Sequence, residues 1–328
     1  MVWTTNFVAR VTLRLAFRVV GGPSARERVW EPGWPCPVAA VLAPLRRGAG
    51  DPTYRIDAGG RHWLGLRTPE GTATLRVEAR ASEGEVHAQA WGDGAEWALA
   101  SLPALLGAED DPTGFEPHHP LVAEALRRHP HLRIGRTGRV MEALVPAIIE
   151  QKVTGQEAFG GYRALVHRHG ERAPGAGADE RLWVQPAPET LRRIPSWEWL
   201  RLHIDPARSR VIVAAAKVAD SLERIAGVDG IEADRRLRSL PGVGVWTSAE
   251  VRSRALGDAD AVSFGDYHLA KEVGWALLGH DIDDVMLGEL LEPYRPHRGR
   301  VPLLLAYAGS RRPRRGPRMA PRTHLPSL

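Results

Sequence analysis

The fold is decided by two short stretches of sequence, LPGVGVWT at residues 240–247 and FGDY at residues 264–267. Apolar-patterned segments flank the first stretch and Pro-Gly-Val-Gly interrupts them, which predicts a helix, a tight hairpin and a second helix. Gly242 and Gly244 carry no Cβ, so the turn backbone can approach a partner closely. Backbone N–H groups near a helix N-terminus suit a phosphate. The pattern predicts either an αα-hairpin without a ligand or a hairpin that binds phosphate.

Asp266 adds a second feature at a fixed distance from this hairpin. It lies twenty residues after Trp246, beyond a loop at 257–265 and at the start of an expected helix at 267–278. Aspartate is favoured as an N-cap, so helix capping is the simplest interpretation. LPGVGxWT followed at this spacing by GDY nevertheless resembles the helix-hairpin-helix DNA glycosylase superfamily, most of all its DNA-3-methyladenine glycosylase II family of alkylation repair. The resemblance covers roughly residues 115–307 and, more faintly, the domain before them.

The resemblance implies roles for individual residues. Asp266 matches the catalytic carboxylate of the family. Trp246 stands where the strand-nicking branches carry a lysine that forms a Schiff base with the sugar. The resemblance therefore implies a monofunctional glycosylase that flips a base from duplex DNA and leaves an abasic site. The implied contacts to the DNA backbone are Gly242, Val243, Gly244 and Thr247.

Several positions depart from the family pattern. Gln151 matches a glutamine that precedes an apolar wedge into the DNA, but Lys152 replaces the wedge with a charged side chain, so the wedge is either its aliphatic stem or another residue. Glu250 and His297 stand where aromatic pocket residues are expected. Glu250 either favours a cationic base or is a solvated glutamate on a helix face. The implied base pocket consists of Trp246, Tyr267, Glu250 and His297.

The chemistry of N-glycosidic cleavage suits these residue types. The bond breaks through a sugar with oxocarbenium character, which a carboxylate beside C1′ can stabilise or supply with an oriented water. Alkylated purines are cationic, and the electron-rich face of Trp246 would favour them by ~0.5–2 kcal/mol of cation–π attraction. Core packing is the alternative role for any one of the eleven tryptophans.

Composition limits the cofactors. Cys36 is the only cysteine, which excludes a disulfide framework, a structural zinc cluster and an iron–sulfur centre. The sequence contains no GxGxxG motif and no P-loop. We expect no metal site and no cofactor, apart from a monovalent cation that the family hairpin can bind through backbone carbonyls without any side-chain signature.

The net charge of +5 comes from the C-terminal end, because residues 311–328 hold six arginines and no acids, which leaves 38 basic and 39 acidic residues in the body. We expect a disordered basic arm that contacts phosphates without reading sequence, although an inert remnant of arginine-rich coding would look the same. The arginines assigned to DNA are Arg311, Arg312, Arg314 and Arg315.

The expected fold class is α+β. Short alternating segments predict a small N-terminal α/β domain with an antiparallel sheet at 29–107, without a cluster of His, Cys, Asp or Glu that suggests chemistry. An all-helical domain is expected at 115–310. Residues 1–28 are expected to form a disordered leader, with an organelle presequence as the alternative.

The expected partner is double-stranded DNA with damaged bases. No apolar run reaches the ~18–20 residues that span a bilayer, so no membrane association is expected. We expect a cytoplasmic, nucleoid-associated monomer without an obligate protein partner. Two other functions stay open: a non-catalytic helix-hairpin-helix DNA-binding protein, and a glycosylase for oxidised or deaminated bases.

Overall fold

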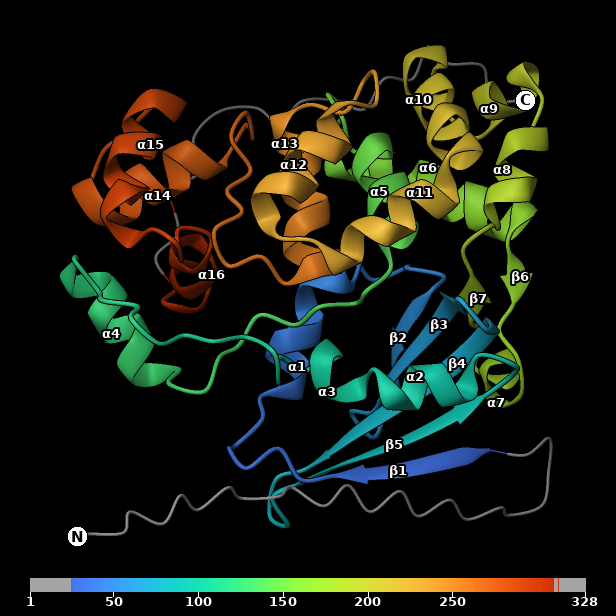
Figure 1. Ribbon diagram of the computed structural model, residues 1–328, viewed down its shortest axis with the longest axis horizontal. Coiled ribbons are helices and arrows are strands. Elements are labelled where there is room, and N and C mark those ends of the chain that lie inside the picture. Colours follow the sequence, from blue (N-terminus) through green and yellow to red (C-terminus); the bar gives the residue numbers. More distant parts are fainter. Residues whose placement is uncertain (1–24, 310–311, 313–328) are drawn as a thin grey trace, which may run out of the picture.

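The computed structural model describes residues 25–309 and Arg312. It places a five-stranded antiparallel sheet beneath a larger helical part (Figure 1). The expected α+β class is therefore confirmed. The leader up to residue 24 and the tail residues 311 and 313–328 lie outside the described residues.

In the sheet, Gly71–Arg80 and Glu85–Trp91 alternate apolar and polar residues, as expected for strands between turn signals, whereas the strand His62–Thr68 is almost entirely buried. Strand order is β1-β5-β4-β3-β2, and every neighbouring pair is antiparallel. The first strand pairs Arg26 with Ala90, so residues 26–28 belong to the sheet and not to the leader. The strands are β1 (Arg26–Trp30), β2 (Tyr54–Ile56), β3 (His62–Thr68), β4 (Gly71–Arg80) and β5 (Glu85–Trp91).

Short helices cover one face of this sheet (Figure 1). Two short helices meet at Ser101, and Pro103 occupies the first turn of the second one, where it needs no N–H partner. Leu75 and Leu102 are fully buried in the shared core. The helical elements of this domain are α1 (Val38–Leu42), η1 (Ala43–Leu45), α2 (Ala95–Ala100) and α3 (Leu102–Leu105).

The helical part has two cores, which we call lobe 1 and lobe 2. Lobe 1 surrounds α5, from which Leu144 and Ile148 are fully buried. The part expected to be all-helical also contains a two-stranded ribbon, β6 (Glu171–Arg172) paired with β7 (Trp183–Val184). The short helix α7 (Ala176–Asp179) lies between these two strands in the sequence. The helices of lobe 1 are α5 (Val140–Ile149), α6 (Gly155–His169), α8 (Pro188–Arg193), α9 (Ser196–Arg201), α10 (Pro206–Lys217), α11 (Ala219–Glu223), η2 (Arg224–Gly227), α12 (Gly230–Arg238) and α13 (Val245–Val251).

Lobe 2 packs four helices and a 3-10 turn around a separate core. A buried ion pair joins Arg300, the first residue of α16, to Asp110 in the linker that follows the sheet domain. None of the helices among residues 25–309 is long and apolar enough to cross a membrane. The elements of lobe 2 are α4 (Pro120–Arg128), α14 (Leu269–Leu278), α15 (Asp284–Leu291), η4 (Glu292–Tyr294) and α16 (Arg300–Tyr307).

Candidate active site

The glycine hairpin between α12 and α13 has the predicted form. Gly242 has φ +91°, and a Cβ there would lie 2.3 Å from Val211 Cγ2, so no larger residue fits without movement. Gly242 and Gly244 are exposed, whereas the Val243 side chain is buried in the lobe 1 core. Gly244 is the N-cap of α13, whose first N–H groups have no partner within the helix. At Gly242 and Gly244 the exposed surface of the hairpin is therefore backbone, flanked by the exposed side chains of Pro241 and Val245.

Two residues that the sequence analysis links to DNA contact the hairpin or each other within the protein. Gln151 Nε2 donates to the Gly242 carbonyl at 2.9 Å and to Thr247 Oγ1 at 2.8 Å. Thr247 is 2% exposed, so its hydroxyl is engaged inside the protein. Sequence spacing could not reveal this bridge, because Gln151 lies in the turn between α5 and α6, far from the hairpin in the sequence. Both side chains brace the turn.

Lys152 is exposed directly beside this bridge. Its backbone has φ +54°, in the left-handed region that residues other than glycine seldom occupy. Lys152 lies in the turn between α5 and α6, and its backbone conformation sets the direction of its side chain.

Asp266 has two separate sets of contacts. Its Oδ1 accepts hydrogen bonds from the N–H groups of His268 and Leu269, at 2.8 and 2.9 Å, and α14 begins at Leu269. Its Oδ2 accepts from Trp246 Nε1 at 3.3 Å. The capping role and the proximity to Trp246 therefore coexist in one carboxylate. Trp246 itself is partly buried against the lobe 1 core.

A cavity of about 360 Å³ adjoins Asp266. This volume is at the lower end of the ~300–1,000 Å³ typical of small-molecule sites. The sheet domain, lobe 1 and lobe 2 all contribute to its wall. The polar lining residues are Arg133, Thr137, Glu250, Ser253, Arg254, Asp258, Ser263, Asp266, His268 and Glu272; apolar residues of the sheet domain include Ala40, Val41, Leu45 and Leu105.

Glu250, which the sequence analysis places in the base pocket, lines this cavity. Its Oε2 pairs with Arg254 Nη1 at 2.7 Å, and its Oε1 accepts from Ser263 Oγ at 2.5 Å. These contacts exclude the alternative of a freely solvated glutamate. Burial would lower the pKa of Arg254, but the charges of Glu250 and Glu150 outweigh it and raise that pKa. Burial also raises the pKa of Glu150, although Arg47 and Arg254 oppose the shift.

Tyr267 and His297, also assigned to the base pocket, do not line this cavity. Tyr267 is 76% exposed, with the Lys271 ammonium 4.0 Å from its ring centroid. His297 is 8% exposed, and its Nε2 lies 3.2 Å from the Thr113 carbonyl. Its sequence position near the site was misleading because the chain turns it toward the linker.

Of the tail arginines, Arg312 alone is described. It forms a bidentate ion pair with Asp281, both bonds being 2.6 Å long. Its charge is already paired within the protein, so contact with DNA phosphate would require exchange of partners.

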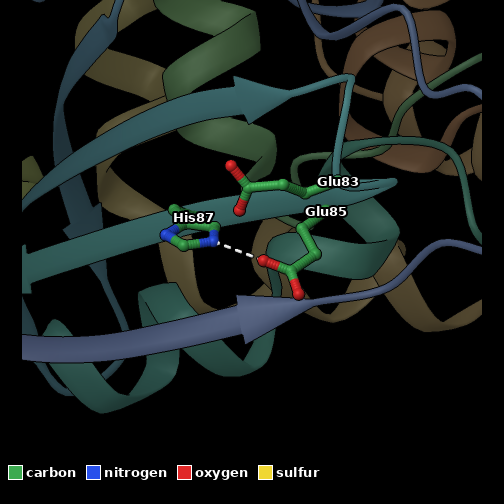
Figure 2. A group of neighbouring side chains, drawn as sticks. All are labelled: Glu83, Glu85 and His87. Atoms are coloured by element: carbon green, nitrogen blue, oxygen red, sulfur yellow. Dashed lines mark hydrogen bonds and ion pairs between the residues drawn. The ribbon is translucent and has the colours of Figure 1, made fainter.

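A separate group of potential metal ligands lies at the start of β5 and in the turn before it, where the sequence analysis expected none (Figure 2). Donor atoms of Glu83, Glu85 and His87 lie within 4.8 Å of one another, and His87 Nε2 is 2.6 Å from Glu85 Oε2. The spacing of two residues on one strand is the signal that could have found it. None of the three lines the cavity.

Comparisons with known proteins agree with this geometry. The chain matches no family model. It is 34% identical over 193 residues to a protein of Mycobacterium tuberculosis named probable bifunctional transcriptional activator/DNA repair enzyme AlkA. The match covers 54% of this chain, which spans only 36% of that relative.

Solved structures share the fold at low sequence identity. The 3-methyladenine DNA glycosylase of Archaeoglobus fulgidus has a TM-score of 0.69 at 18% identity, with 86% of this chain and 98% of that chain covered. The apo 8-oxoguanine glycosylase/lyase of Clostridium acetobutylicum has a TM-score of 0.65 at 12% identity, with 89% and 98% covered. The chain thus has the helix-hairpin-helix DNA glycosylase fold, and just over half of it is similar in sequence to a protein named as a probable AlkA DNA repair enzyme.

Proposed function

We propose that the chain is a monofunctional DNA N-glycosylase that excises alkylated purines from duplex DNA. The observation that carries the proposal is the Asp266 carboxylate, held by two backbone N–H groups and Trp246 beside a base-sized cavity and the glycine hairpin. We further propose that the protein acts as a monomer at the nucleoid.

The hairpin, the cavity and Asp266 would each perform a different step of the proposed reaction. Exposed backbone at Gly242 and Gly244 would contact phosphate, and the target nucleotide would leave the stack for the cavity. The C1′–N bond then breaks and the cationic base leaves as a neutral base with the bonding electrons. Water supplies the oxygen that joins C1′ and releases one proton to the solvent. Asp266 would stabilise the sugar cation and orient that water.

The charges around the cavity favour a cationic base. Its lining contains four carboxylates and two guanidinium groups. Arg254 is paired with Glu250, and Arg133 donates to the Asp110 carbonyl and lies 4.5 Å from the Trp34 ring centroid. The negative charges of the lining therefore outnumber the positive ones, and a cationic alkylated purine matches this cavity better than a neutral base. The carboxylate at the cavity also argues against a protein that only binds DNA.

The direct test is a panel of duplexes that each carry one defined lesion. Free base and alkali-labile sites are expected from 3-methyladenine or 7-methylguanine duplexes, and not from a matched undamaged duplex. Excision confined to 8-oxoguanine or hypoxanthine would favour the alternative glycosylase. Binding without release of any base would favour the non-catalytic alternative.

Borohydride is not expected to trap the protein on DNA. An imine needs an amine near C1′, and Trp246 stands at the position where a lysine would supply one. Of the three lysines, Lys271 lies over the exposed Tyr267 ring and Lys152 lies beside the hairpin. Reduction followed by denaturing electrophoresis should show free protein, with strand breaks only after alkali. A covalent adduct would contradict the monofunctional mechanism, and Lys152→Ala or Lys271→Ala would then identify the amine.

A further inference from the structure

Asp266 follows a loop, residues 257–265, that has neither helix nor strand hydrogen bonding along it. The loop starts after a π-helical turn, Arg252–Leu256, and leads from lobe 1 to α14 of lobe 2. Gly257 ends that turn with φ +69°. Because helical and strand bonding is missing here, contacts of individual loop residues, most of them through side chains, determine where Asp266 lies.

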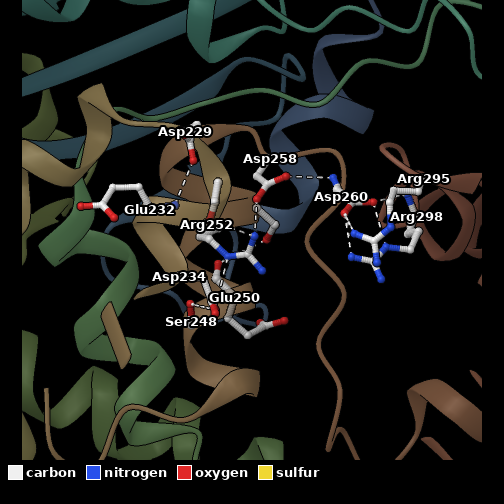
Figure 3. Close-up of polar contacts among 12 residues, drawn as sticks. Asp229, Glu232, Asp234, Ser248, Glu250, Arg252, Asp258, Asp260, Arg295 and Arg298 are labelled. Atoms are coloured by element: carbon white, nitrogen blue, oxygen red, sulfur yellow. Dashed lines mark hydrogen bonds and ion pairs between the residues drawn. The ribbon is translucent and has the colours of Figure 1, made fainter. Parts of the chain in front are cut away.

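The first anchor joins the loop to both helices of the hairpin (Figure 3). Arg252 Nη1 donates to Asp258 Oδ2 at 2.5 Å and to the Gly230 carbonyl at 3.4 Å. Asp234 of α12 accepts from Ser248 Oγ of α13 at 2.7 Å, and its Oδ1 is 3.8 Å from Arg252 Nε. Both members of the Arg252–Asp258 pair are largely buried.

The second anchor joins the loop to lobe 2 (Figure 3). Asp260 accepts three hydrogen bonds from Arg298: from the backbone N–H at 3.1 Å, from Nε at 2.9 Å and from Nη2 at 2.7 Å. Arg295 adds a contact at 3.3 Å. Beside them, the Gly299 N–H donates to the Ala259 carbonyl at 2.8 Å.

The third anchor acts directly before the carboxylate. Glu250 holds the Ser263 hydroxyl, and the Ser263 carbonyl accepts the Asp266 N–H at 3.1 Å. Asp284 Oδ2 also accepts the Gly265 N–H at 2.8 Å. The chain is therefore fixed immediately before Asp266 as well as at Asp258 and Asp260.

We propose that Arg252, Arg298 and Glu250 are positioning residues that set the place of Asp266 through the loop 257–265. The inference rests on the proposed glycosylase function and adds which residues determine its catalytic geometry. A displacement of ~1 Å at a reacting group can cost ~10²-fold in rate, so loosening an anchor should lower the rate of chemistry. DNA affinity should be preserved when the anchor lies far from the hairpin.

Arg298 offers the sharpest test because its anchor faces lobe 2 and not the hairpin. Arg298→Ala removes the two side-chain bonds to Asp260 and leaves Arg295, so the loop loosens without a fully unpaired carboxylate. Arg298→Lys keeps the charge but loses the planar fork. Arg192→Ala, which removes an exposed pair with Glu189, is the matched control.

Three measurements on full-length protein separate the outcomes: single-turnover base release at saturating lesion duplex, duplex Kd, and amide hydrogen exchange of residues 257–269. We expect Arg298→Ala to slow base release by ~10–100-fold and to change the duplex Kd less than about threefold. The amide hydrogens of the loop should exchange faster in this variant than in the wild type. Arg298→Lys should be intermediate in release and exchange, and Arg192→Ala should match wild type in all three.

If amide exchange of the loop were unchanged in Arg298→Ala, Arg298 would not anchor the loop. If exchange were faster but the rate of base release unchanged, Arg298 would anchor the loop without positioning Asp266. A loss of rate that is matched by loss of DNA affinity would also contradict the positioning role. Failure of the glycosylase proposal would look different, because wild-type protein would then release no base. In that event the exchange measurement still decides whether Arg298 holds the loop.

Discussion

Asp266→Asn is expected to slow base release by ~10²–10³-fold, the loss typical of removing one preorganised electrostatic contact. The asparagine oxygen can still accept the N–H groups of His268 and Leu269, so the start of α14 should persist. What disappears is the negative charge, and the group beside Trp246 Nε1 becomes an N–H₂ that cannot accept its hydrogen bond. The ground-state fold changes little, while the sugar cation loses its stabilising charge.

Single-turnover release from a 3-methyladenine or 7-methylguanine duplex measures this effect. Duplex Kd and thermal stability should remain near the wild-type values and serve as controls. Near-complete activity of the asparagine variant would show that another group performs the chemistry.

Arg300→Ala should lower the free energy of unfolding by ~3–5 kcal/mol, the cost of leaving a buried charge unpaired. Arg300 and Asp110 side chains are 3% and 2% exposed, and their two hydrogen bonds are 2.6 and 2.9 Å long. Asp110 also accepts a hydrogen bond from the Ile134 N–H at 2.9 Å. This one carboxylate therefore connects the segment after the sheet domain to the segment before α5 and to the start of α16.

Urea unfolding of the full-length protein, followed by circular dichroism, measures the change. The exposed Arg128–Glu124 pair on α4 supplies the control, since Arg128→Ala should cost at most ~1 kcal/mol. Removing both partners, in Arg300→Ala with Asp110→Ala, should cost less than Arg300→Ala alone if the penalty comes from an uncompensated charge. Equal effects of Arg300→Ala and Arg128→Ala would contradict the special role of the buried pair.

Local signals predicted the elements whose structure depends on nearby residues. The hairpin at 240–247 follows from two glycines between apolar segments, and the sheet hairpins follow from alternation around turn residues. The resemblance also indicated that Trp246 and Asp266 lie close together, and in the structure Trp246 Nε1 is 3.3 Å from Asp266 Oδ2.

Tertiary contacts determine what the sequence could not predict. Gln151 could have faced DNA or the hairpin, and only the packing of α5 against α13 turns its amide toward Gly242. His297 follows a turn that directs it to Thr113, away from the cavity. In the sequence, Asp258 and Asp260 look like ordinary loop aspartates. Their partners are Arg252, in the preceding helical turn, and Arg298, which is 38 residues further along the chain, so the sequence alone does not reveal the two ion pairs.

The cavity wall has a consequence for how such a protein can diversify. Ala40, Val41 and Leu45 come from the sheet domain, while the reactive carboxylate and its anchors come from residues 250–300. A substitution such as Ala40→Leu can thus reshape the space for a base without touching the reactive group or the glycine turn. Under the proposed function, part of the shape of the base pocket is encoded apart from its charged and reactive groups, so point changes in the codons of the sheet domain would adjust which base fits while those groups stay in place.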